Sequence, residues 1–133
     1  MKNILVLILA ISLLLSSCIK KFSPEDVCSL DGDVDAWISA TSIRIQKIST
    51  EASITVSDIE NIYADQKNQE TPSCLKTAQE YAVEAFLNQW QAAKAMDSND
   101  LASATSYLAK SHQASIQMSK EIERLAELNE WQR

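Results

Sequence analysis

The stretch Ser-Ile-Thr-Val-Ser-Asp-Ile-Glu at residues 53–60 decides how this chain folds. It separates two segments that have helical periodicity, because the β-branched residues 54–56 are weak helix formers. Ser57 and Glu60 then have the spacing of a capping box, in which a hydroxyl and a carboxylate satisfy backbone N–H groups at the start of a helix. The stretch therefore predicts that one helix ends before it and that a second begins at Ser57.

Outside this break, the chain consists of segments in which apolar residues recur every three or four positions, as in amphipathic helices. The predicted helices span residues 33–52, 57–69, 72–96 and 101–132. Thr71 is expected to cap the third helix and Pro72 to occupy its first turn. Trp37 lies beside the apolar stripe of the first predicted helix. The stripes of the predicted helices place further apolar residues toward the core, among them Ile45, Met96, Leu101 and Leu108. No segment alternates like a strand, so the sequence predicts an all-α fold.

Cys28 and Cys74 connect the topology of these helices to a covalent bond. A continuous rod from the first helix through the second would be about 55 Å long and would hold the two cysteines at opposite ends. A reversal near residues 54–56 instead places them at the same end, where Cα atoms can approach to the roughly 4.4–6.8 Å that a disulfide requires. We therefore expect a small up-down-up-down bundle of four helices with a Cys28–Cys74 disulfide. Two free or buried thiols are the alternative.

The N-terminus has the features of an exported protein. Lys2 precedes an apolar run from Ile4 to Leu15 that only Ser12 interrupts. A run of about twelve residues is too short to cross a bilayer, which requires roughly 20. A basic residue followed by such a run is typical of a secretory signal peptide.

The end of this run, Leu15-Ser16-Ser17-Cys18, resembles the lipobox of bacterial lipoproteins. The resemblance implies that residues 1–17 are a cleaved signal peptide and that Cys18 becomes the lipidated N-terminus. Two or more acyl chains, such as palmitate, anchor a protein stably to a membrane. Ile19 rather than Asp follows the cysteine, which implies the outer membrane in an enteric-like Gram-negative host. An ordinary signal peptide with an incidental cysteine and an uncleaved membrane helix are the alternatives.

The resemblance defines the expected domains: a signal peptide at residues 1–17, a lipidated N-terminus and linker at 18–32, and a helical bundle at 33–133. Pro72-Ser73-Cys74 opens the long central segment after a short helix, which resembles small helical bacterial lipoproteins of unknown function. That class carries no activity that could be transferred to this chain.

The composition excludes several classes of function. The formal net charge is −6, which disfavours nucleic acid as a partner, because phosphates require neutralising Lys and Arg. A single glycine leaves no room for a phosphate-binding loop. The cysteines do not form a Cys-x-x-Cys pair, so a thiol–disulfide exchange enzyme is not expected. We expect no catalytic residues, no cofactor and no enzyme activity.

An alternating acidic motif, Asp31, Asp33 and Asp35, resembles the opening of an EF-hand loop. The sixth and twelfth positions hold Ala36 and Ser42, where that loop requires Gly and Glu. Acidic residues are also favoured in the first turn of a helix by its dipole. We therefore expect a helix start here and no metal site.

Val83, Leu87 and Trp90 are spaced i, i+4 and i+7, so they share one face of the third predicted helix. They form a possible exposed apolar stripe for a protein partner. The alternative is that this stripe packs against a neighbouring helix.

A second region of interest lies in the middle of the fourth predicted helix. Ser111 and Ser115 stand where large apolar residues would otherwise continue the stripe, and His112 is the only histidine. This region is expected to be under-filled. We therefore expect a membrane-anchored envelope lipoprotein that acts by binding another envelope protein, as an adaptor or accessory subunit. The alternative is a protein that binds a small ligand inside its helical bundle.

Overall fold

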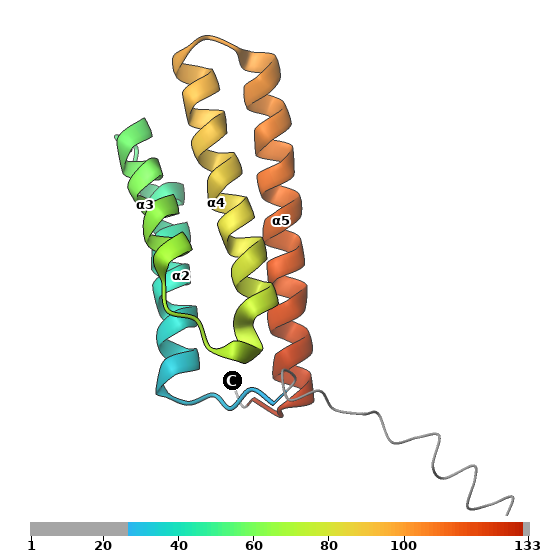
Figure 1. Ribbon diagram of the computed structural model, residues 1–133. Coiled ribbons are helices and arrows are strands. Elements are labelled where there is room, and N and C mark those ends of the chain that lie inside the picture. Colours follow the sequence, from blue (N-terminus) through green and yellow to red (C-terminus); the bar gives the residue numbers. More distant parts are fainter. Residues whose placement is uncertain (1–26, 132–133) are drawn as a thin grey trace, which may run out of the picture.

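The computed structural model describes residues 27–131, which form a four-helix bundle without strands in that range (Figure 1). Its elements are α2 (Gly32–Thr50), α3 (Val56–Asn68), the short 3-10 helix η3 (Ser73–Leu75), α4 (Lys76–Asp97) and α5 (Leu101–Leu128). Successive helices run in opposite directions, which confirms the predicted up-down-up-down bundle. The predicted signal peptide at residues 1–17, the lipidation site Cys18 and residues 19–26 lie outside the described residues.

The chain reverses between α2 and α3 as expected, but the capping residue is Thr55 and not Ser57. The Thr55 hydroxyl accepts a hydrogen bond from the backbone N–H of Asp58 at 3.1 Å, and the Asp58 carboxylate accepts one from the Thr55 backbone N–H at 2.9 Å. The carboxylate also accepts a hydrogen bond from the Thr55 hydroxyl, which lowers the pKa of Asp58 most, and the bond from the Thr55 N–H lowers it further, because both stabilise the charged form. The capping box thus begins two residues before the predicted one.

The start of α4 also differs from the prediction. Thr71 does not cap a helix, since its hydroxyl donates to the Gln69 carbonyl oxygen at 3.0 Å. The chain enters α4 through η3, and neither element has a side-chain cap at its start. The other two helices are capped by aspartate: Asp31 accepts from the Val34 N–H, and Asp100 accepts from the Ser103 N–H. The bonds from Ser103 lower the pKa of Asp100 for the same reason as at Asp58.

The main core lies in the half of the bundle that contains the disulfide. Trp37 is only 1% exposed and is the largest fully buried side chain among the described residues. It belongs to a cluster that joins α2 to η3, α4 and α5: Cys28, Val34, Trp37, Cys74, Leu75, Ala78, Ala82, Met118 and Leu125. Apolar burial is the dominant favourable term in folding, so this cluster makes a large contribution to the stability of the bundle.

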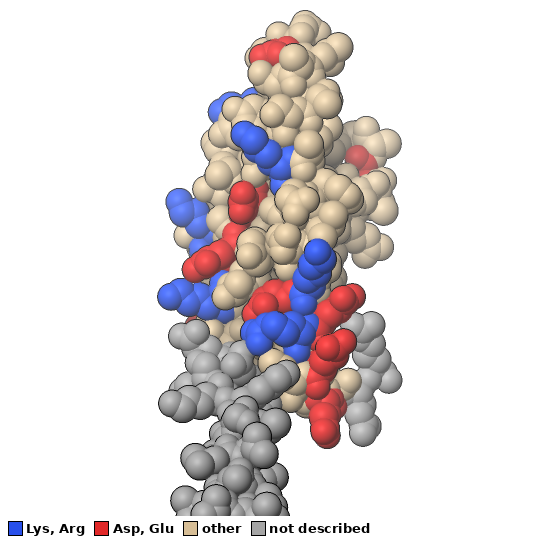
Figure 2. All heavy atoms as spheres, turned by 90° about the vertical axis from the view of Figure 1, so that its right-hand side faces the viewer, with Lys and Arg blue, Asp and Glu red and all other residues tan. Residues whose placement is uncertain are grey.

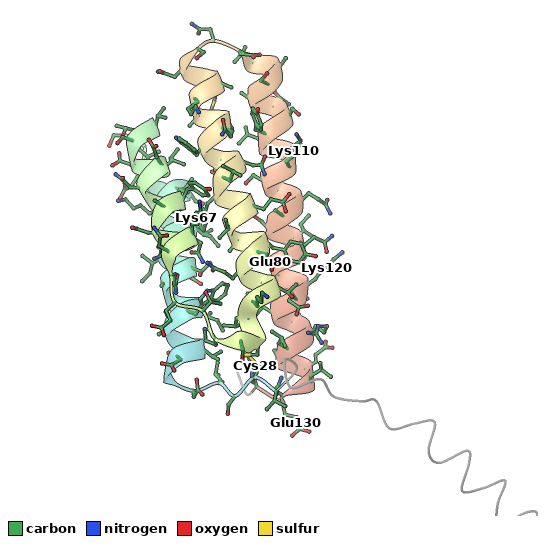
Figure 3. The ribbon with its side chains drawn as sticks, in the orientation of Figure 1. Cys28, Lys67, Glu80, Lys110, Lys120 and Glu130 are labelled. Carbon is green, nitrogen blue, oxygen red and sulfur yellow. A yellow bond between two sulfur atoms is a disulfide. The ribbon has the colours of Figure 1, made fainter. Side chains whose placement is uncertain are left out.

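Cys28 and Cys74 form the predicted disulfide, with Cα atoms 5.4 Å apart, at the base of the bundle (Figure 3). Cys28 also contacts the end of α5. Its backbone N–H donates to Asn129 Oδ1 at 2.9 Å, and its carbonyl oxygen accepts from Trp131 Nε1 at 2.6 Å. Residue 28 was expected in a linker, yet it is 1% exposed and joins the N-terminal segment to both η3 and the end of α5.

Candidate functional site

The predicted partner stripe lies partly against α3. Val83, Leu87 and Trp90 are all half-buried. The Trp90 ring stacks on Tyr63 of α3, with ring centroids 5.7 Å apart and planes at 15°, and the Lys94 ammonium lies 4.4 Å from the Trp90 centroid. The Trp90 end of the stripe is therefore occupied by α3, which favours the alternative of packing against a neighbouring helix.

The region expected to hold a small ligand is nearly filled. Ser111 is 2% exposed, His112 is exposed, and only Ser115 of the three lines a cavity. This cavity lies between α2, α4 and α5, is lined by apolar side chains such as Ile45, Phe86 and Met118, and has a volume of about 40 Å³. Sites for small organic ligands are typically about 300–1,000 Å³, so this cavity has room for a few waters at most.

Three apolar side chains are exposed in the distal part of the α4–α5 hairpin, the end of which extends beyond α2 and α3 (Figure 1). Met96 is 49% exposed, Leu101 71% and Leu108 43%, and we refer to these three residues as the distal surface. Their predicted burial was wrong because α2 ends at Thr50 and leaves this end of the hairpin uncovered. Leu101 and Leu108 are seven residues apart, so both lie on one face of α5.

Charge is distributed unevenly along α5, and the distal surface lies at its uncharged end. Within α5, residues 101–119 contain a single charged residue, Lys110. The following residues 120–130 contain six: Lys120, Glu121, Glu123, Arg124, Glu127 and Glu130. Figure 2 shows acidic side chains gathered at the lower end of this face, and Figure 3 places Glu130 at the base beside Cys28. Docking on this part of α5 would thus desolvate few charges of the helix itself, while Asp97 and Asp100 lie in the adjoining loop beside Met96 and Leu101.

Two other site classes have no support in residues 27–131. No group of three or more His, Cys, Asp or Glu side chains in that range is arranged to hold a metal ion. Of the acidic motif, Asp31 serves as the N-cap of α2, and Asp33 and Asp35 lie in its first turn. Among the same residues, no helix combines the length and the apolar character needed to cross a bilayer.

Gln66 is the centre of a buried polar network that the sequence did not predict. It is fully buried, and its Nε2 donates to Gln79 Oε1 of α4 at 2.7 Å and to Thr41 Oγ1 of α2 at 3.2 Å. Its Oε1 accepts from Arg44 Nη1 at 2.7 Å. The side chain therefore links α2, α3 and α4 and fixes their register. A signal was present in the sequence, because Gln66 follows Ile59 and Ile62 by seven and four positions on the buried face of α3.

We expect Gln66→Leu to lower the free energy of unfolding by about 2–3 kcal/mol, because it leaves the buried Thr41 hydroxyl without its partner and removes one hydrogen bond each from Gln79 and Arg44. Urea denaturation followed by circular dichroism measures the change. Gln46→Leu is the matched control, since Gln46 is an exposed glutamine of α2, and it should change stability by less than about 0.5 kcal/mol. Equal stability of both variants would contradict a structural role for the network.

Comparison with protein families, with curated proteins and with solved structures finds no match for this chain. Its function therefore has to be inferred from its own surfaces. Two features were not predicted from the sequence. The distal surface exposes apolar side chains that were expected to be buried, and the Gln66 network buries polar side chains.

Proposed function

We propose that this protein is a lipid-anchored helical lipoprotein of the bacterial cell envelope, attached through Cys18, which acts by binding another envelope protein as an adaptor or accessory subunit. The lipobox resemblance of residues 15–18 supports the anchor and the compartment. The single observation that supports protein binding is the distal surface, where three large apolar side chains are exposed. Binding rather than catalysis is proposed as the activity.

The position of the distal surface suits this role, because it lies at the opposite end of the bundle from residues 27–28, the described residues closest in sequence to the proposed anchor at Cys18. The described chain begins next to Cys28 at the base, and the distal surface lies at the far end of the hairpin (Figure 1). The 28 residues of α5 rise by about 42 Å. The nine residues 18–26 add at most about 32 Å between the anchor and the base. We propose that the distal surface faces a partner about 40–70 Å from the membrane.

An amphipathic helix is the proposed form of the partner segment. The lower part of the hairpin already receives such a helix, since Val34 and Trp37 of α2 pack against α4 and α5 in the core cluster. Beyond the end of α2, Leu108 of α5 remains partly uncovered. A helix that places apolar residues three and four positions apart would cover this continuation in the same way.

The alternative of small-ligand binding has less support. The cavity that Ser115 lines has a volume of about 40 Å³, and His112 is exposed outside it. An open hollow of about 150 Å³ beside Gln113 and Ala114 is also smaller than a typical site for an organic ligand. No specific observation in residues 27–131 favours an organic ligand there.

The double variant Leu101→Glu and Leu108→Glu is expected to reduce crosslinking to the partner at least about tenfold, because burying two carboxylates in an apolar contact is unfavourable. The measurement is chemical crosslinking of the full chain in the native envelope, with capture and mass spectrometry. Ile43→Glu is the matched control. Ile43 is an apolar residue of α2 that is 65% exposed and is not part of the distal surface. Its replacement should therefore leave crosslinking unchanged.

Thermal melting of the purified variants shows whether lost crosslinking reflects lost folding. A folded double variant that still crosslinks to the same partner would contradict binding through the distal surface. Recovery of self-crosslinks alone with the unmodified chain would contradict the adaptor role itself.

A further inference from the structure

A groove runs along α2 on the side of the segment that connects α3 to η3. It has a volume of about 510 Å³, and its walls are one face of α2 from Asp33 to Arg44 and residues 69–72. We propose that this groove, called the Arg44 groove, binds an extended peptide segment of a partner protein through a carboxylate on that segment. The proposal shares with the proposed function only the premise that the partner is a protein, and it does not involve the distal surface.

The Arg44 guanidinium is held in place by neutral acceptors. Its Nη1 donates to Gln66 Oε1 at 2.7 Å and also to Gln69 Oε1. Both hydrogens of Nη1 are thereby used, which fixes the plane of the guanidinium. Gln66 is fully buried and bonded to α2 and α4, so it is itself a rigid support.

The opposite edge of the guanidinium is free. Within residues 27–131, Arg44 Nε and Nη2 make no hydrogen bond, and Arg44 has no carboxylate partner. In the same range, the only buried side-chain nitrogen or oxygen without a hydrogen bond is Trp90 Nε1. Arg44 Nε and Nη2 are therefore both accessible to solvent. The structure thus holds a half-buried cation that makes no ion pair, in a groove whose lining also includes the carboxylates of Asp33 and Glu70.

This free edge has the geometry that recognises a carboxylate. Nε–H and Nη2–H are parallel donors, and a carboxylate accepts both in a bidentate pair. Because the two glutamines already fix the plane, little side-chain entropy remains to be lost on binding. The two amides that hold Arg44 are neutral, so neither of them offsets its charge.

The remaining walls of the groove favour an extended peptide. Ala36 and Ala40 have small side chains, which allow a backbone to approach α2 closely. Asp33 lies eleven residues before Arg44, or about 16 Å along the helix. An extended peptide covers this distance in about five residues. Complementarity to Arg44 and Asp33 therefore predicts a segment with an acidic residue at Arg44 and a basic residue about five positions away, near Asp33. Glu70 is exposed on the opposite wall, so the acidic residue has to pair with Arg44 on the side away from Glu70.

The test uses the full chain and the peptide acetyl-Ser-Glu-Thr-Val-Thr-Ser-Lys-amide, in which the Glu and the Lys are five positions apart. The control peptide has Gln in place of Glu. NMR titration follows the indole N–H signals of the three tryptophans. We expect a saturable shift of Trp37, which lines the groove, without a shift of Trp90 or Trp131, and at least about tenfold weaker binding of the control peptide.

Variants of the protein separate the site from the fold. Arg44→Gln should weaken the Glu peptide at least about tenfold, and Arg44→Lys should fall between, because it keeps the charge and loses the bidentate pair. Lys47→Gln removes an exposed cation of the same helix and should change nothing. The distal double variant should also bind the peptide normally, so failure of the proposed function is distinguishable from failure of this site.

Three results would overturn the proposal: equal binding of the two peptides, no saturable binding of either, or unchanged binding by a folded Arg44→Gln variant. If Arg44→Gln does not fold, the comparison of the two peptides on the unmodified chain still decides the outcome.

Discussion

Replacing both Cys28 and Cys74 with serine should lower the free energy of unfolding by about 4 kcal/mol. The disulfide joins residues 46 positions apart, and a cross-link that closes a loop of about this size removes that much chain entropy from the unfolded state. The total stability of a domain of about 100 residues is only about 5–15 kcal/mol, so the variant should be close to unfolding. Urea denaturation of the full chain, followed by circular dichroism, measures the loss.

Two controls isolate the effect of the cross-link. Reduction of the unmodified chain with dithiothreitol opens the same loop and should produce the same loss. Asn129→Ala keeps the disulfide and removes the side-chain hydrogen bonds to Cys28 and to the Leu125 carbonyl oxygen, so it should lower stability by about 1–2 kcal/mol, well below the loss in the cysteine variant. A double cysteine variant that loses less than about 1 kcal/mol would contradict the loop-closure estimate.

Trp37→Ala should be as damaging, with a loss of about 4 kcal/mol, because it empties the centre of the core cluster. The ring is 1% exposed, and its Nε1 donates to Gln79 Oε1 at 3.0 Å. The substitution therefore removes both the packing between α2 and its neighbours and one bond of the buried network. Loss of near-ultraviolet circular dichroism and a lower urea midpoint are the expected observations.

Trp37→Phe separates these two contributions. It keeps an aromatic ring in the core and removes the bond to Gln79, whose Oε1 still accepts from Gln66. We expect a loss of about 1–2 kcal/mol. If the phenylalanine and alanine variants were equally destabilised, burial of the ring would not be the main contribution of Trp37.

Helical periodicity predicted the number, order and approximate bounds of the helices, because each segment has enough turns to show a clear apolar face. The capping residues were harder to predict. Thr55 with Asp58 and Ser57 with Glu60 both have the spacing of a capping box, and the local sequence offers no basis for choosing between them. The disulfide could be predicted because only one chain reversal brings Cys28 and Cys74 together.

Burial at the far end of the bundle could not be read from periodicity alone. Leu108 lies on the apolar face of its helix, as predicted, but an apolar face is buried only where a neighbour reaches it. α2 has 19 residues and α3 has 13, whereas α4 has 22 and α5 has 28. The predicted helices already had unequal lengths. That difference could have indicated that the end of the α4–α5 hairpin is left uncovered.

The Gln66 network and the Arg44 groove were missed for a different reason. A glutamine or arginine in an amphipathic helix normally faces water, and its burial depends on partners that are distant in the sequence. Gln66 meets Thr41, 25 positions away, and Gln79, 13 positions away, only because three helices converge. The spacing of Gln66 after Ile59 and Ile62 indicates that it faces the core, but its partners become visible only once those helices are placed in space.

The position of the disulfide also determines how the molecule would bear mechanical force. A pull between residue 27 and the distal loop at residues 98–100 has a covalent route from Cys28 across the sulfur–sulfur bond to Cys74 and then along α4. This route bypasses residues 29–73, so α2 and α3 carry none of the tension along the backbone. Reduction of the bond would reroute the load through α2 and α3, and the bundle would then be pulled apart helix by helix.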